Sequence, residues 1–227
     1  MKHRSFARQS GFTLVEIAIV LVIIGLLLGG VLKGQEMIEN AKTKSVVNDM
    51  KAIQAAYNGY VDRYKAIPGD ELQVTTNARG WPNTVGPLAS NGILAAPIGS
   101  TFTNAAGENQ SFWQSLRASG LLSGDATAVG VPALPTHAAN GTIGIATGQV
   151  YGLSGTFVCA SNLTTKQAAA IDVLVDGPLP ASNIGNTVGT LRAATGAAPL
   201  APVAALPAAT AYNETATLTP WTVCMQI

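Results

Sequence analysis

A long apolar segment near the N-terminus constrains this chain more than any other sequence feature. Residues 12–32 contain one ionisable side chain, that of Glu16. As an α-helix this segment would span about 31 Å, which matches the hydrocarbon thickness of a bilayer. The residues before it contain one lysine, two arginines and no acid. The positive-inside rule places this end in the cytoplasm, so the sequence predicts one membrane crossing with the remaining chain on the exported side.

The acid inside this segment needs a partner. A carboxylate in hydrocarbon is costly unless another group pairs with it, so an intramembrane acid indicates a functional role. A secretory signal peptide would be cut after its apolar region, at a small-x-small site. Residues 31–35 lack that pattern, and a helical pattern continues through them. The alternative is an uncleaved signal anchor that carries an accidental acid.

Residues 11–16, with the sequence GFTLVE, resemble the processing site of type IV prepilins and of the pseudopilins of type II secretion. The resemblance implies that a prepilin peptidase cleaves between Gly11 and Phe12 on the cytoplasmic side, and that Phe12 is then N-methylated. Glu16 becomes the fifth residue of the mature chain. In this family that acid attracts the new N-terminal amine of a neighbouring subunit. A carboxylate and an ammonium that are each costly in lipid become tolerable together.

The resemblance covers residues 5–66 and divides the chain into three parts. Residues 1–11 are expected to form a prepilin leader, and residues 12–66 the N-terminal helix, with 12–32 as its transmembrane and assembly segment. Residues 67–227 are expected to form a periplasmic or surface globular domain. The predicted fold class is α+β and pilin-like, with the long helix packed on a small antiparallel sheet domain that has long loops.

Apolar residues at steps of three and four continue the helical pattern beyond the membrane segment. They are Val46, Val47, Met50, Ile53, Tyr57, Val61 and Tyr64. Pro68 and Gly69 then end the helix, because proline disfavours helix in the residue before it. Residues 71–110, rich in turn formers, predict a surface excursion.

Further elements follow from periodicity and from β-forming residues. The predictions are a helix over 111–122, strands near 141–145 and over 150–159, a helix over 164–175, strands over 188–193 and 218–225, and an irregular alanine and proline tract over 194–210.

Two cysteines, Cys159 and Cys224, lie on the exported side. In an oxidising compartment an even number of cysteines predicts a disulfide. Closing a loop of this length would stabilise the domain by roughly 4 kcal/mol, because the bond lowers the chain entropy of the unfolded state. A disulfide-bounded C-terminal region is likewise a feature of type IV pilins. Two free buried thiols are the alternative.

The sequence offers no convincing catalytic site, so we expect no enzyme and no catalytic residues. Residues 152–155 place Ser154 between glycines but lack the Gly-x-Ser-x-Gly spacing of a nucleophile elbow. The base available outside the leader is His137, expected in a proline-bounded loop. Asp172 and Asp176 lie four apart on a predicted helix, where a solvated face is the expected location and a calcium site the weaker alternative. No metal ligands and no cofactor are expected.

The charge balance of the chain argues against a nucleic-acid-binding protein that relies on neutralising backbone phosphates. Without the leader, ten lysines and arginines face twelve acids, so a basic surplus for nucleic-acid binding is lacking. A nucleic-acid partner stays undecided.

The sequence therefore favours a structural subunit of a type IV pilus or related pseudopilus filament, and the chain length favours a minor subunit. The resemblance implies these partners: other pilin or pseudopilin subunits, prepilin peptidase, an inner-membrane assembly platform, and membrane lipid before assembly. It also implies a bacterial inner-membrane location, and then a cell-surface or periplasmic filament. The alternative is a membrane-anchored periplasmic or surface binding module, adhesin-like or for DNA uptake, delivered by a pilin-like N-terminus.

Overall fold

The computed structural model describes residues 13–81, 84–87, 90–213 and 219–227. The chain divides into two compact units, Met1–Ala41 and Lys42–Ile227, and each is described by itself. Gly11 and Phe12, the predicted processing residues, lie outside the described residues.

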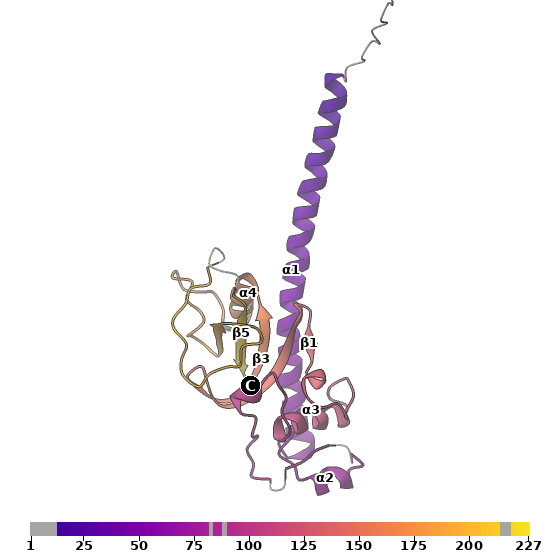
Figure 1. Cartoon of the computed structure of the whole chain (residues 1–227), viewed down its shortest axis with the longest axis vertical. Helices are drawn as coiled ribbons and strands as arrows, with labels where there is room; N and C mark the ends of the chain where they lie inside the picture. Colours follow the sequence, from indigo (N-terminus) through magenta and orange to yellow (C-terminus); the bar gives the residue numbers. More distant parts are fainter. Residues whose placement is uncertain (1–12, 82–83, 88–89, 214–218) are drawn as a thin grey trace, which may run out of the picture. The chain divides into compact units, whose positions relative to one another are not determined.

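The predicted N-terminal helix is present as α1, Leu14–Tyr64, a helix of 51 residues (Figure 1). Its part in the first unit is almost entirely solvent-exposed. Its part in the second unit has a buried face, made by Thr43, Val46, Val47, Met50, Ile53, Ala56 and Tyr60. These residues recur at three- and four-residue steps, so one side of the helix faces the core of the second unit. The helix ends just before the predicted stop at Pro68.

The second unit contains one antiparallel sheet of five strands in the order β1-β2-β3-β5-β4. The strands are β1 Thr136–His137, β2 Gly141–Val150, β3 Leu153–Leu163, β4 Leu191–Thr195 and β5 Trp221–Gln226. The C-terminal strand β5 lies between β3 and β4. This arrangement joins segments that are far apart in the sequence.

In the described part of this unit, three further helices and two short 3-10 helices accompany the sheet. They are α2 Gln73–Ala78, α3 Glu108–Ala118, α4 Thr165–Asp176, η1 Ile98–Ser100 and η2 Val131–Ala133. Thr164 begins α4 with a capping box, in which its side chain accepts from the backbone N–H of Gln167 while the Gln167 side chain accepts from that of Thr164. Helix α4 packs on β4 and β5 (Figure 1). The Trp221 indole of β5 donates to Thr165 Oγ1 at 3.1 Å, which ties the start of β5 to α4.

Alternation along the strands separates two apolar clusters. On β3 and β5, Val158 and Val223 belong to the main core, which also contains the buried residues of α1, α3 and α4. Their neighbours Phe157, Cys159 and Cys224 belong to a second cluster with Phe102, Ala146, Val150 and Tyr151. Because successive strand residues point to opposite faces, both faces of this part of the sheet are covered.

The α+β, pilin-like fold class is confirmed, while several predicted boundaries are wrong. The predicted strand over 150–159 is interrupted by a hairpin turn at Tyr151 and Gly152, which have positive φ angles of 49° and 81°. Residues 141–163 therefore form two long strands. The helix predicted over 111–122 begins earlier, at Glu108, and ends at Ala118, before the positive φ of Gly120. Residues 71–110 contain α2 and η1, which periodicity did not indicate because both are short.

Candidate assembly site

Most of the exposed large apolar side chains among the described residues lie on the helix of the first unit. The large apolar side chains from Leu14 to Leu32 keep between 46% and 91% of their area exposed. Among the described helices, α1 alone is long and apolar enough to cross a membrane. Side chains of this kind are stable in lipid or against other apolar helices, and unfavourable in water.

Glu16 lies in the first turn of α1 and forms a capping box with Thr13. Its Oε2 accepts hydrogen bonds from the Thr13 backbone N–H and from Thr13 Oγ1, both at 2.8 Å. The Glu16 backbone N–H in turn donates to Thr13 Oγ1 at 3.3 Å. A carboxylate at a helix N-terminus also has a favourable interaction with the helix dipole. The acid that the sequence singled out thus completes the N-terminal cap of the helix, which the resemblance alone did not indicate.

Glycines interrupt the apolar surface of α1 without breaking the helix. A Cβ added at Gly25, Gly29, Gly30 or Gly34 would meet no atom within 4 Å. The helix backbone is therefore accessible at these positions, and small residues of this kind allow close approach of helices in a membrane. Beyond the apolar segment, Lys33 and Glu36 form an exposed ion pair at 2.8 Å.

The second unit contains the predicted disulfide. Cys159 and Cys224 are directly paired in the register of β3 and β5, and their sulfur atoms are bonded. Both residues are fully buried in the second apolar cluster. The bond therefore joins the C-terminal strand to the centre of the sheet.

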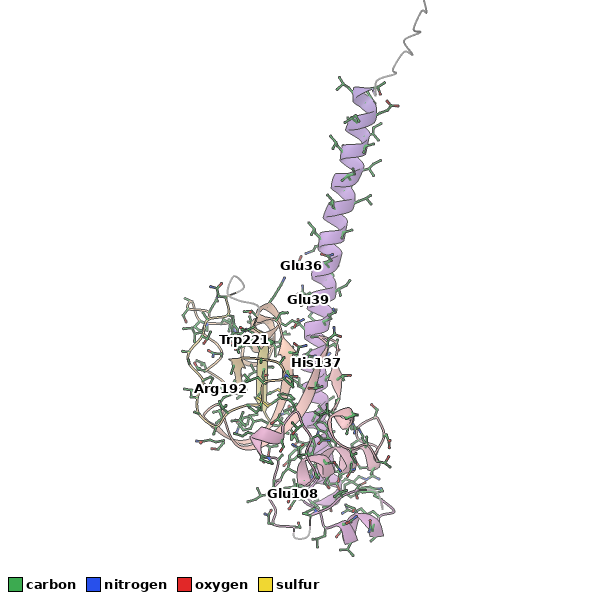
Figure 2. The ribbon with its side chains drawn as sticks, in the orientation of Figure 1. Glu36, Glu39, Glu108, His137, Arg192 and Trp221 are labelled. Atoms are coloured by element: carbon green, nitrogen blue, oxygen red, sulfur yellow. A yellow bond between two sulfur atoms is a disulfide. The ribbon has the colours of Figure 1, made fainter. Side chains whose placement is uncertain are left out.

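The structure does not bring Ser154 and His137 together as a catalytic pair. His137 lies on the edge strand β1 (Figure 2), and not in a loop as predicted. Its Nε2 contacts the Ser161 carbonyl oxygen at 3.0 Å, and its Nδ1 accepts from the Ala139 backbone N–H at 3.3 Å. Both ring nitrogens are thus used by the backbone. Burial lowers the pKa of His137, and the hydrogen bond to Ser161 and the charge of Asp49 oppose that shift.

The expectation that Asp172 and Asp176 share a solvated helix face is wrong for Asp172. Asp172 is buried, and its Oδ2 accepts from the Tyr212 hydroxyl at 2.7 Å. Burial raises its pKa, with the Tyr212 hydrogen bond acting in the opposite direction. Asp176 is exposed and accepts from the backbone N–H groups of Thr190 and Leu191. The two carboxylates therefore bind different loops of the protein.

Two buried acids that the sequence did not single out organise the segment after α1. Asp70 accepts hydrogen bonds from Ser90 Oγ, at 3.0 Å, and from the backbone N–H groups of Asn91 and Gly92, at 3.1 and 2.7 Å. Glu71 pairs with both terminal nitrogens of Arg79. The turn Pro68-Gly69-Asp70 was visible in the sequence, but the partners of Asp70 lie about twenty residues away along the chain.

The Arg79 side chain also contacts aromatic rings at the end of α1. Its guanidinium lies 4.4 Å from the ring centre of Tyr64 and 5.5 Å from that of Trp81. The Tyr60 hydroxyl donates to Glu71 at 2.5 Å. Tyr60 is fully buried while Tyr64 is half-buried, so the tyrosines of α1 form core and rim, as the sequence indicated.

These features define a class: an α+β protein of pilin-like architecture, in which one of the described helices is long and apolar enough to cross a membrane. Residues 6–32 match the family described as the prokaryotic N-terminal methylation motif, which is the signature of type IV pilins and pseudopilins. The matched residues extend from the basic leader to the end of the apolar segment and include Gly11, Phe12 and Glu16. No curated protein matches the chain significantly. The motif and the fold together support a type IV pilin-like protein.

Proposed function

We propose that this chain is a structural subunit of a type IV pilus or of a related pseudopilus filament. The observation that carries the proposal is the apolar surface of residues 14–32, which the described residues leave exposed and which has Glu16 in its first turn. Helices of neighbouring subunits would cover that surface in a filament. Repetition of one heterologous contact along an axis builds a fibre and not a closed ring.

Processing is the first step of the proposed pathway. Prepilin peptidase removes residues 1–11 by cleavage between Gly11 and Phe12, and Phe12 is N-methylated. Before assembly the chain crosses the inner membrane once, with its N-terminus in the cytoplasm and residues 67–227 in the periplasm. The assembly platform then transfers it into a filament of pilin or pseudopilin subunits. The chain length favours a minor subunit.

Glu16 is the proposed recruiting group. Its carboxylate lies in the first turn of α1, and Glu16 is four residues along the chain from Phe12, where processing would create the new amine. A neighbouring subunit's amine would pair with this carboxylate, so two groups that are costly in lipid would neutralise each other. The hydrogen bonds from Thr13 keep the acid acceptable in the membrane before that partner arrives.

The N-terminal mass of the protein recovered from membranes tests the processing step. With the host's prepilin peptidase present, we expect a mature chain that begins at Phe12 and carries one added methyl group. Without the peptidase, we expect the chain to begin at Met1. A chain that begins at Met1 in both strains, or one cut beyond Leu32, would contradict the proposal and favour a tethered or secreted domain.

Substitutions of Glu16 separate its two roles. Glu16→Gln keeps an acceptor for the capping box and removes the charge, whereas Glu16→Ala removes both. If charge pairing recruits the subunit, both variants lose incorporation into filaments while their membrane levels stay normal. Normal incorporation of Glu16→Gln together with failure of Glu16→Ala would show that capping, and not charge, is what assembly requires.

A membrane-anchored binding module is the second candidate. It is favoured by a pocket on the second unit, lined by residues of α1, β2 and β3 and of the loop around Ile93. Normal export and folding of a Glu16→Ala chain whose biological activity is unchanged would favour this candidate over the filament subunit.

A further inference from the structure

A pocket of about 470 Å³ lies beside the β2–β3 hairpin of the second unit. Volumes of this size are typical of sites for small molecules. Its floor is the outer part of the hairpin, where Gly148 of β2 is paired with Gly155 of β3. A Cβ added at Gly148 would meet no atom within 4 Å, so the space above this glycine is open. Gly148 therefore adds no side chain to this floor, whereas at Gly155 the side chain of Gln226 lies 2.9 Å from where a Cβ would be.

One wall of the pocket is the loop that carries Ile93 and Leu94. Asp70 holds the start of this loop through Ser90, Asn91 and Gly92. Thr147 of β2 holds its end, because the Thr147 N–H donates to the Ala96 carbonyl oxygen at 2.7 Å and the Ala96 N–H donates to Thr147 Oγ1 at 2.9 Å. A wall fixed at both ends reduces the ordering cost of binding.

The half-buried ring of Tyr57 is another part of the lining. Phe112 of α3 stacks on this ring at a centre-to-centre distance of 6.4 Å. Burial raises the pKa of the Tyr57 phenol, and its interaction with the side chain of Thr156 on β3 opposes that shift. The ring is thus held by α3 on one side and by the sheet on the other. A tyrosine in this setting offers an apolar face and a polar edge.

The lining combines apolar groups with neutral polar groups. Hydroxyl groups of Ser154 and Thr156, the amide of Gln149 and the phenol of Tyr57 are combined with aliphatic groups. Among the eleven described residues that line the pocket, none has a charged side chain. A charged ligand would lose hydration without a compensating partner, so this lining disfavours it. A ligand with neutral hydroxyl groups and apolar C–H faces would match both the rim and the ring.

We propose that this pocket binds a neutral saccharide, with Tyr57 against the apolar face of the sugar and with Gln149 and Ser154 as hydrogen-bonding groups at its rim. Gln149 and Ser154 are both exposed, on β2 and β3 respectively, and they are register partners in the hairpin. The site does not depend on Glu16 or on filament assembly, because every lining residue belongs to the second unit.

Saturation-transfer NMR on the full chain in dodecylphosphocholine micelles tests this proposal, since that detergent has no sugar headgroup. The probes are glucose, galactose and N-acetylglucosamine, with glucuronic acid and glucosamine as charged counterparts of the same ring size. We expect transfer to at least one neutral sugar and none to the charged ones. Transfer to no neutral sugar, or equal transfer to charged and neutral sugars, would overturn the proposal.

Variants locate the binding. Gln149→Ala combined with Ser154→Ala removes two rim groups, and we expect an affinity at least about fivefold weaker for the neutral sugar. Gln73→Ala is the matched control, because Gln73 is equally exposed but lies on α2, outside the pocket. Binding that is unchanged in the double variant, or weakened as much by the control, would place the sugar elsewhere and contradict the assignment. Urea unfolding midpoints confirm that each variant is folded.

Discussion

The two units of this chain differ in the exposure of their large apolar side chains. In the first unit, Leu14 is 91% exposed and Leu26 is 73% exposed. In the second, Trp113, Tyr60 and Phe157 have no exposed area. The second unit therefore completes its own core, while the apolar surface of the first is left for lipid or other chains to cover.

Polar groups show the reverse contrast. The first unit has one acid in its apolar segment, which is satisfied within a single helical turn by Thr13. The second unit buries Asp70, Glu71 and Asp172 and gives each of them partners from other segments. A buried acid is stable when its hydrogen bonds are made, so these acids fix loops in place. The difference indicates that the second unit depends on long-range contacts that the first does not use.

Loss of the disulfide should have the largest effect, and this effect should be confined to the second unit. Replacement of Cys159 and Cys224 by alanine removes a link across 65 residues, and we expect the free energy of unfolding of the second unit to fall by about 4 kcal/mol. Urea unfolding of the full chain in micelles, followed by tryptophan fluorescence, measures this. Membrane association should be unchanged. A stability loss below about 1 kcal/mol would show that the packing of β5 on β3 and β4 suffices without the bond.

A charge placed on each exposed apolar surface should have different consequences. Ile23 is 50% exposed and Val173, on α4, is 43% exposed. Ile23→Asp should disfavour membrane insertion by about 3 kcal/mol, whereas Val173→Asp should change the unfolding free energy by less than about 0.5 kcal/mol. Alkaline extraction of membranes tests the first change and urea unfolding the second. Equal membrane retention of both variants would contradict the transmembrane assignment of residues 12–32.

Two aspartates with similar hydrogen bonds test the role of burial. Asp70 and Asp176 each accept from one hydroxyl and two backbone N–H groups, but Asp70 is buried and Asp176 is exposed. We expect Asp70→Ala to cost about 2 kcal/mol of unfolding free energy and Asp176→Ala clearly less, because water can replace the lost partner only at the exposed site. Equal losses would mean that burial does not set the cost.

The pH dependence of stability should show the smallest effect. The pKa of His137 is lowered from 6.5 in the folded state, so the unfolded chain binds the proton more readily. The stability contributed by neutral His137 is complete above pH 6.5 and is lost as the pH falls below it, down to the folded pKa. The raised pKa values of Asp49 and Asp172 act in the opposite direction. The difference in unfolding free energy between the native chain and His137→Gln therefore reports the histidine together with its coupling to Asp49. A difference independent of pH between 7 and 5 would contradict the buried neutral state of His137.

Local patterns predicted the elements whose causes lie within the element itself. The membrane segment, the buried stripe of α1 and the capped helix after Thr164 follow from residues three or four apart. The break in the β2–β3 hairpin was missed because Tyr151, a β-forming residue, adopts a positive φ angle in the turn. The burial of Asp172 was missed because its partner, Tyr212, is forty residues away.

By itself the sequence determined the apolar N-terminal segment, the methylation motif, the single acid of that segment and the two cysteines of the second unit. These properties depend on residue type and on spacing along one helix or one extended segment. Only the tertiary structure decided that β5 lies between β3 and β4, that Asp70 fixes the loop around Ile93, and that Tyr57, Gln149 and Ser154 border one pocket. The physical reason is that these contacts join segments distant in the chain, and their energies depend on burial that no local pattern specifies.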